Sequence, residues 1–194
     1  MGTLYGYPYS SRFQPRANLT PMSYCVAVRS PTIDPCHLPY HDTEYGFPLQ
    51  NDNDLFERLI LEINQAGLSW TTILKKRAGF REAYAQFDIP TIAAFSEDDH
   101  ARLMADARII RNRLKIKAAT RNAQVALELI SQHGSFAAWL NLHRGSDLTA
   151  WTKLFRKTFA FTGGEIVREF LVSTGYLPGA HDPDCPIYFL MPKE

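Results

Sequence analysis

A glutamate and a tryptophan flank a glycine break, and this pair could bind a planar ligand and supply acid/base chemistry. Glu62 shares a helical face with apolar residues, so burial would raise its pKa and cationic neighbours would lower it. Trp70 follows a serine that can cap a second helix, and Gly67 ends the first. The break directs both side chains toward one cleft. Periodicity alone also fits a surface Glu62 paired with Arg58, and a Trp70 that belongs to the core.

A second candidate site is a metal centre that joins the two ends of the chain. Histidine and cysteine form a chelating pair in a C-terminal loop, and an N-terminal segment holds the other half. Such a Cys₂His₂ set suits tetrahedral zinc with no open position, hence a structural site. Spacing alone leaves Cys36 and His37 as competing ligands, and free cysteines with surface histidines as the alternative. The candidate ligands are Cys25, His41, His181 and Cys185.

A third feature is a basic cluster at the start of a long predicted helix. Backbone N–H groups at a helix N-terminus together with cations suit a phosphate group. A solvated basic helix face explains the same charge pattern equally well. The cluster comprises Arg111, Arg113, Lys115, Lys117 and Arg121.

Helical periodicity dominates the elements that must position these residues, and no segment shows strand alternation or a repeat. The fold class is therefore predicted to be all-α. Asn53 or Asp54 is expected to cap the helix that carries Glu62. Residues 1–23 are interpreted as a flexible leader, and residues 25–50, which contain Tyr40 among prolines, as irregular. Helices are predicted near residues 53–65, 69–76, 80–87, 100–105, 113–133, 135–142, 148–157 and 164–174, and a further helix is predicted to begin at Pro90.

Composition limits the classes of protein to consider. The 194 residues fit one domain, and 45% hydrophobic and 12% aromatic residues suffice for a packed core. A net charge of +1 offers no global field, so nucleic-acid binding would need a local basic patch. Three cysteines are too few for a disulfide framework and fit a reducing compartment. No membrane span and no secretory signal are evident, so a cytoplasmic location is expected. The protein is also expected to be a monomer.

Three segments together resemble the DNA-3-methyladenine glycosylase I family of the helix-hairpin-helix superfamily. The resemblance extends over most of the chain, from about Cys25 to Cys185, and its second marker is long and specific. The markers are residues 40–48 (YHDTEYGFP), 65–77 (QAGLSWTTILKKR) and 109–116 (IIRNRLKI).

This resemblance implies a single helical glycosylase domain over residues 24–194, with the helix-hairpin-helix near 103–117. It implies hydrolysis of the N-glycosidic bond of alkylated purines, chiefly 3-methyladenine, in base excision repair, and double-stranded DNA as the partner. Glu62 would carry the catalytic role, with Tyr40, Trp70 and His37 around the base. Arg111, Arg113 and Lys115 would hold the DNA backbone. Structural zinc would be bound by Cys25, His41, His181 and Cys185.

Several positions depart from the family pattern. His37 stands where the family has tyrosine, Ala27 where it usually has tryptophan, and Arg108 where the hairpin has glycine. No lysine stands out as a Schiff-base nucleophile, which favours a monofunctional hydrolase. Asp42 and Glu165 are both candidates for activating water. The alternatives are a catalytically weak paralogue that binds alkylated DNA, and a glycosylase for a bulkier lesion.

Overall fold

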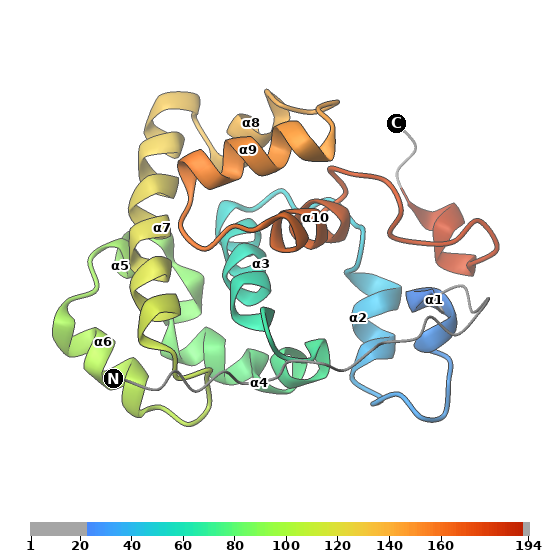
Figure 1. The fold of residues 1–194 in the computed structure, drawn as a ribbon, viewed down its shortest axis with the longest axis horizontal. Coiled ribbons are helices and arrows are strands. Elements are labelled where there is room, and N and C mark those ends of the chain that lie inside the picture. The colour runs from blue at the N-terminus through green and yellow to red at the C-terminus, as the bar shows by residue number, and fades with distance from the viewer. Residues whose placement is uncertain (1–22, 192–194) are drawn as a thin grey trace, which may run out of the picture.

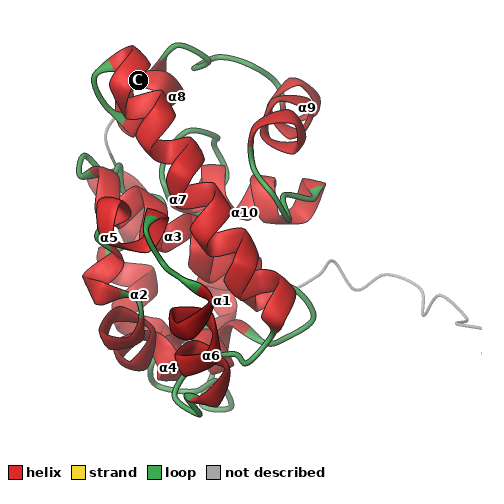
Figure 2. Cartoon of the chain, turned by 90° about the vertical axis from the view of Figure 1, so that its left-hand side faces the viewer, coloured by secondary structure: helices red, strands yellow, loops and turns green. Residues whose placement is uncertain are grey.

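The structure, a computed structural model, describes residues 23–191, and every regular element in that range is helical (Figures 1 and 2). The all-α prediction is confirmed. No helix in the described range is long and apolar enough to cross a membrane. The elements are α1 (Tyr24–Ala27), α2 (His37–Thr43), α3 (Asp52–Gln65), α4 (Trp70–Ala83), the 3₁₀ turn η1 (Ala85–Phe87), α5 (Ile89–Ala93), α6 (Glu97–Ala105), α7 (Arg113–His133), α8 (Phe136–Asn141), α9 (Leu148–Thr158), α10 (Gly164–Ser173) and the 3₁₀ turn η2 (Pro186–Leu190).

Helix α3 runs through the centre of the molecule (Figure 1) and packs against α4, α7, α8 and α10. Residues 55–64 are all buried, including the charged side chains among them. Each fully buried leucine or phenylalanine contributes about 1.5–3 kcal/mol by leaving water, so this helix is held firmly. A polar side chain on α3 must therefore find a partner or face a cavity.

The cap of α3 differs from the prediction. Its N-cap is Asn51, whose side-chain oxygen accepts hydrogen bonds from the backbone N–H groups of Asn53 and Asp54 at 2.8 and 3.3 Å. Asn53 instead accepts a bond from the N–H of Ile89 at 3.2 Å. The predicted cap at Asn53 or Asp54 was wrong because the four consecutive residues 51–54 are all Asn or Asp and all suit the position, and tertiary contacts select one.

Helix α4 is continuous, whereas two helices were predicted around a break near residues 77–79. Gly79 lies inside α4 and serves packing rather than termination. A Cβ atom there would lie 2.6 Å from the Cβ atom of Arg108 and 2.9 Å from its carbonyl oxygen. Glycine therefore lets the loop between α6 and α7 approach α4 closely.

The N-terminal helices α1 and α2 lie beside the C-terminal segment at one side of the molecule (right of Figure 1). The irregular segment predicted for residues 25–50 thus contains two short helices, and that part of the prediction was wrong. The leader predicted for residues 1–23 lies outside the described residues except for Ser23. The Ser23 side chain accepts a hydrogen bond from the N–H of Val26 and caps α1.

The segment predicted as helix-hairpin-helix has the expected form. Helix α6 begins with a capping box formed by Ser96 and Asp99, and α7 spans the predicted residues 113–133. Between them, residues 106–112 form a short connection. Asn112 caps α7 by accepting hydrogen bonds from the N–H groups of Leu114 and Lys115 at 3.0 and 3.2 Å.

Candidate functional site

A cavity of about 610 Å³ opens where α1, α2, α3 and α10 meet the C-terminal segment. Aromatic rings and carboxylates dominate its wall, a lining suited to a planar polar ligand. The lining residues are Ser23, Tyr24, Cys25, Tyr40, Tyr45, Glu62, Gln65, Trp70, Glu165, Arg168, Glu169, Gly179, Ala180 and Asp182.

Glu62 projects from α3 into this cavity and is only 4% exposed. Among the described residues, no side chain or backbone group hydrogen-bonds its carboxylate. Burial raises the pKa of Glu62 to about 8, an effect that Arg58 opposes and Glu169 reinforces. The alternative of a surface ion pair is wrong, because Arg58 is itself buried and pairs with Glu44. A buried carboxylate without a partner in the protein can accept a hydrogen bond from a ligand in the cavity.

Trp70 reaches the same cavity from the start of α4. Gly67 has φ +83°, a left-handed conformation that reverses the chain after α3, and Ser69 caps α4 through the N–H of Thr72 at 3.2 Å. The Trp70 and Tyr40 rings lie 5.3 Å apart between centroids at 55°. The buried Nε1 of Trp70 has no hydrogen-bond partner in the described part of the chain. The predicted convergence of Glu62, Trp70 and Tyr40 on one cavity agrees with this geometry.

Tyr24 and Tyr45 also line the cavity, and sequence reasoning missed both as pocket residues. Their rings meet edge to face with centroids 5.2 Å apart. His37, predicted to contact the base, is not on the cavity wall. Its Nδ1 lies 2.9 Å from the hydroxyl of Tyr24, and its Nε2 lies 2.8 Å from Oγ1 of Thr71. His37 therefore orients Tyr24 and does not contact the ligand itself. Tyr24 could have been found in the sequence, because it is an aromatic residue directly before the predicted metal ligand Cys25.

The four predicted metal ligands converge in a buried cluster, with their donor atoms within 4.8 Å of one another. Nε2 of His41 lies 3.3 Å from Sγ of Cys25 and 4.0 Å from Sγ of Cys185. Nδ1 of His181 lies 3.2 Å from Nε2 of His41 and 3.9 Å from Sγ of Cys185. Bonds of about 2.0–2.3 Å to tetrahedral zinc imply ligand separations of roughly 3.3–3.8 Å, so the set fits such an ion. Cys36 is not part of the cluster.

Neighbouring groups fix the tautomers of both histidines. Nδ1 of His41 lies 2.6 Å from a carboxylate oxygen of Asp42, and Nε2 of His181 lies 2.8 Å from the carbonyl oxygen of Tyr45. Each of these nitrogens donates to its acceptor, which leaves the other ring nitrogen bare and directed at the cluster. The N–H of Asp182 donates to Sγ of Cys25 at 3.3 Å, as a metal-bound thiolate would require. The Cys₂His₂ cluster is thus able to hold a metal ion, and it joins the N-terminal helices to the C-terminal segment.

The two carboxylates considered for water activation occupy different places. Asp42 is committed to His41 and does not line the cavity. Glu165 lines the cavity at its outer edge, where its side chain is exposed. Glu169 is a further acidic group on the wall and accepts a hydrogen bond from the Tyr45 hydroxyl at 3.3 Å. The cavity thus holds acidic groups at two depths, with Glu62 the deeper.

The predicted DNA-contacting residues divide into two groups. Arg111 and Arg113 are exposed at the start of α7 and form no ion pair within the described residues. Lys115 is only 7% exposed, and its Nζ donates to the carbonyl oxygens of Asn64 and Ala66 at 3.1 and 2.8 Å. Lys115 therefore faces inward, and burial lowers its pKa. It caps the C-terminus of α3 and supports the turn before Trp70, because a cation satisfies the last helical carbonyls.

Arg108, at the position where glycine was expected, has an ordinary backbone conformation. Its N–H and guanidinium both donate to Asp106, and the guanidinium also pairs with Glu82 on α4. These acids hold the connection between α6 and α7 in place. They also neutralise the Arg108 charge, so Arg111 and Arg113 remain the free cations of this loop.

Comparison with known proteins gives concordant matches. The family model for methyladenine glycosylase matches residues 30–150. DNA-3-methyladenine glycosylase 1 of Escherichia coli is 37% identical over 145 residues, covering 74% of this chain and 78% of that protein. DNA-3-methyladenine glycosylase of Haemophilus influenzae is 35% identical over 169 residues, covering 77% and 91%. The structure of 3-methyladenine DNA glycosylase I from Staphylococcus aureus superimposes with a TM-score of 0.76 at 33% identity, covering 84% and 95%.

Proposed function

The chain belongs to the methyladenine glycosylase family, and we propose that it releases alkylated adenine, chiefly 3-methyladenine, from double-stranded DNA. The observation that carries this proposal within the molecule is Glu62, a buried carboxylate without a hydrogen-bond partner in an aromatic cavity. Such a group suits a ligand that is both planar and a hydrogen-bond donor. An alkylated adenine turned out of the helix has these properties.

The chemistry follows from the charge of the damaged base. Alkylation at N3 makes adenine a cationic leaving group, so the glycosidic bond is already weak and modest assistance suffices. Trp70 and Tyr40 offer π-faces that attract a cation. Glu62 accepts a hydrogen bond from the exocyclic amine and so binds the cationic base of damaged DNA in preference to a neutral one. When the glycosidic bond breaks, its electrons neutralise the departing base and the positive charge passes to the sugar. The rings and the carboxylate therefore hold the base while the bond to the sugar breaks.

The reaction is a hydrolysis without a covalent enzyme intermediate. No lysine among residues 23–191 lines the cavity, so no amine is placed to form a Schiff base. Water is the nucleophile, and Glu165 is the carboxylate at the cavity edge that could orient it. Asp42 has a structural role beside His41 instead. A monofunctional glycosylase is the mechanism that this arrangement favours.

Zinc is the metal we assign to the Cys₂His₂ cluster, because two thiolates and two imidazoles in a closed tetrahedral set are typical of structural zinc. Zinc would neutralise the thiolates and hold α1, α2 and the C-terminal segment together. It would take no part in base release. Thiolate ligands need a reducing compartment, which supports a cytoplasmic location.

Trp70→Ala should weaken capture of the base by roughly 5- to 100-fold. Base–aromatic stacking is worth about 1–3 kcal/mol per base, and this variant removes the larger of the two facing rings. The measurement is the single-turnover rate of base release against enzyme concentration. Trp139→Phe is a control, because Trp139 is a core residue away from the cavity. A Trp70→Ala variant with the wild-type half-saturation concentration would contradict the stacking role.

Arg111→Ala and Arg113→Ala should each weaken duplex binding alike for all sequences, and each should reduce the salt slope by about one. These side chains are exposed at the start of α7, where phosphate binding is favourable. Lys115→Ala should instead lower the melting temperature and leave the salt slope unchanged, because its ammonium faces the carbonyl groups of α3. Fluorescence anisotropy across a salt series measures the slopes. A wild-type slope in both arginine variants would remove this loop from the interface.

A panel of duplexes tests the substrate class. Each duplex carries one modified base: 3-methyladenine, an adenine with a bulkier N3 substituent, 7-methylguanine or hypoxanthine. We expect release of 3-methyladenine to be fastest. Ala27 is not among the residues that line the cavity, whereas Tyr24 is. Faster release of the bulkier base would favour the alternative of a different lesion, and binding without release of any base would favour the non-catalytic alternative.

A further inference from the structure

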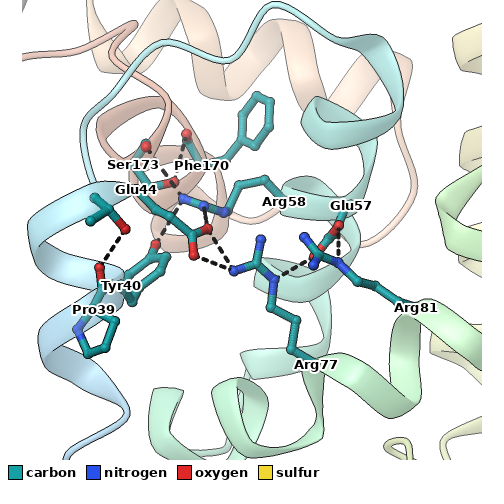
Figure 3. Close-up of polar contacts among 10 residues, drawn as sticks. Pro39, Tyr40, Glu44, Glu57, Arg58, Arg77, Arg81, Phe170 and Ser173 are labelled. Atoms are coloured by element: carbon teal, nitrogen blue, oxygen red, sulfur yellow. Dashed lines mark hydrogen bonds and ion pairs between the residues drawn. The ribbon is translucent and has the colours of Figure 1, made fainter.

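Arg58 is a charged side chain in the core, one helical turn before Glu62 on α3 and only 2% exposed. Its Nη1 donates to the hydroxyl oxygen of Tyr40 at 2.9 Å, and its Nη2 donates to Glu44 at 3.3 Å (Figure 3). Its guanidinium carbon lies 4.9 Å from the centroid of the Tyr40 ring. A guanidinium in a protein is always protonated and can only donate. The direction of the Arg58–Tyr40 hydrogen bond is therefore fixed.

The fixed direction determines what Tyr40 can do. Its hydroxyl oxygen accepts from Arg58, and among residues 23–191 no acceptor is placed for the hydroxyl hydrogen. Tyr40 lines the cavity, so that hydrogen is available to a ligand. We propose that Arg58 is a positioning residue that commits the Tyr40 hydroxyl to donate to the base, beside Glu62 as acceptor. This inference rests on the proposed function and specifies which base edge the pocket reads.

A donor beside an acceptor matches one edge of adenine. Adenine presents the N6 amino group as donor and N7 as acceptor, whereas guanine presents O6 and N7, both acceptors. Tyr40 would donate to N7, and Glu62 would accept from N6. Guanine would place O6 against a carboxylate, and 7-methylguanine has also lost the acceptor at N7. Tyr40 and Glu62 together thus select an adenine whose N6 and N7 edge is unmodified, such as one alkylated at N3.

The surrounding charges reinforce the same polarity. Arg58 belongs to a network of ion pairs that contains three cations and two carboxylates, so the network lacks one negative charge (Figure 3). Glu62 lies in the same part of the core, and Arg58 counteracts the rise that burial causes in its pKa. Arg58 therefore favours the acceptor form of Glu62 as well as the donor role of Tyr40. The members of the network are Arg58, Arg77, Arg81, Glu44 and Glu57.

A double-mutant cycle tests the proposal. The readout is the affinity for free 3-methyladenine relative to free 7-methylguanine, measured by quenching of tryptophan fluorescence. Arg58→Met should reduce this preference about 5- to 10-fold, the worth of one hydrogen bond. Tyr40→Phe should do the same, and the double variant should lose less than the product of the two single losses. Arg102→Met, which removes an arginine outside this network and outside the cavity wall, should keep the wild-type preference.

Two results would overturn the role of Arg58. One is a wild-type preference in Arg58→Met, and the other is a double variant whose losses multiply. Should Arg58→Met not fold, wild type and Tyr40→Phe are compared on 3-methyl-7-deazaadenine, in which C–H replaces N7. Wild type should bind this analogue about 5- to 10-fold more weakly than 3-methyladenine, whereas Tyr40→Phe should bind both alike. Equal binding by wild type would overturn the proposal. Because free bases report on the pocket without catalysis, absence of base release would count against the proposed function only.

Discussion

Glu62→Gln should lower the rate of 3-methyladenine release about 100-fold. The amide keeps the shape of the side chain but cannot take up the negative charge that a bound cationic base induces in Glu62. A hydrogen bond to a charged group is worth up to about 3 kcal/mol, and each 1.4 kcal/mol corresponds to a factor of ten. Single-turnover kinetics on methylated DNA measure this loss. Affinity for undamaged DNA should remain near that of wild type, because Glu62 lies inside the cavity.

The same variant should be more stable than wild type, and the gain should grow with pH. The ordinary pKa of glutamate, 4.5, applies to the unfolded chain, and burial raises the pKa of Glu62 to about 8 in the folded protein. Between these values the folded state binds the extra proton, so ionisation destabilises wild type progressively as pH rises from about 4.5 to 8. Glutamine removes this cost. Melting temperatures of wild type and Glu62→Gln at pH 5 and pH 8 test this stability difference. In the kinetic test above, a Glu62→Gln variant that releases 3-methyladenine at the wild-type rate would refute the role of Glu62.

Removal of the metal should lower the melting temperature by about 10 °C or more while most helical content persists. The Cys₂His₂ cluster joins α1 and α2 to the C-terminal segment, whereas α3, α7 and α10 pack in a separate apolar core. Metal binding contributes folding free energy, and loss of several kcal/mol shifts the transition of a protein of this size by about 2–4 °C per kcal/mol. Circular dichroism with and without a chelator measures both quantities. Base release should also fall, because Tyr24 adjoins Cys25 and lines the pocket.

Cys185→Ala should reproduce the effect of the chelator, and Cys36→Ala provides the matched control. Cys185 is a buried member of the cluster, whereas Cys36 is not part of it. Elemental analysis should find one zinc per chain in wild type and Cys36→Ala, and none or a weakly held ion in Cys185→Ala. Clean wild-type protein without metal, or a loss of metal in Cys36→Ala, would contradict the assigned ligands.

The sequence predicted those parts of the fold that local signals control. Helix α7 and the capping box before α6 follow from periodicity and from side chains that satisfy nearby N–H groups. The break predicted near residues 77–79 was wrong because Gly79 lies inside α4 and allows a close contact with Arg108, which is distant in sequence. Helix α2 was missed because Pro39 and its neighbours suggest a loop, whereas burial of Tyr40 and His41 stabilises the helix.

The candidate site was predicted where a motif fixed the residue, and less well where packing decided its direction. Glu62, Trp70 and Tyr40 face one cavity as expected. Lys115 and His37 instead form hydrogen bonds inside the protein, Lys115 with a carbonyl oxygen of α3 and His37 with the Tyr24 hydroxyl. Sequence periodicity does not show whether such a side chain points to solvent or to a buried partner. The role of Arg58 could not be predicted from local sequence patterns, because its partners Tyr40 and Glu44 come from another segment of the chain.

The most direct measurement of the central claim is chromatography of the bases freed from duplex DNA that carries radiolabelled methyl groups. The pocket described above, with Trp70 stacking and Glu62 accepting from the amine, predicts that 3-methyladenine appears in the soluble fraction. It also predicts that 7-methylguanine stays in the DNA, and that Glu62→Gln frees far less label in the same time. DNA that keeps all its 3-methyladenine while wild-type protein is bound, or that loses both bases at equal rates, would contradict the account.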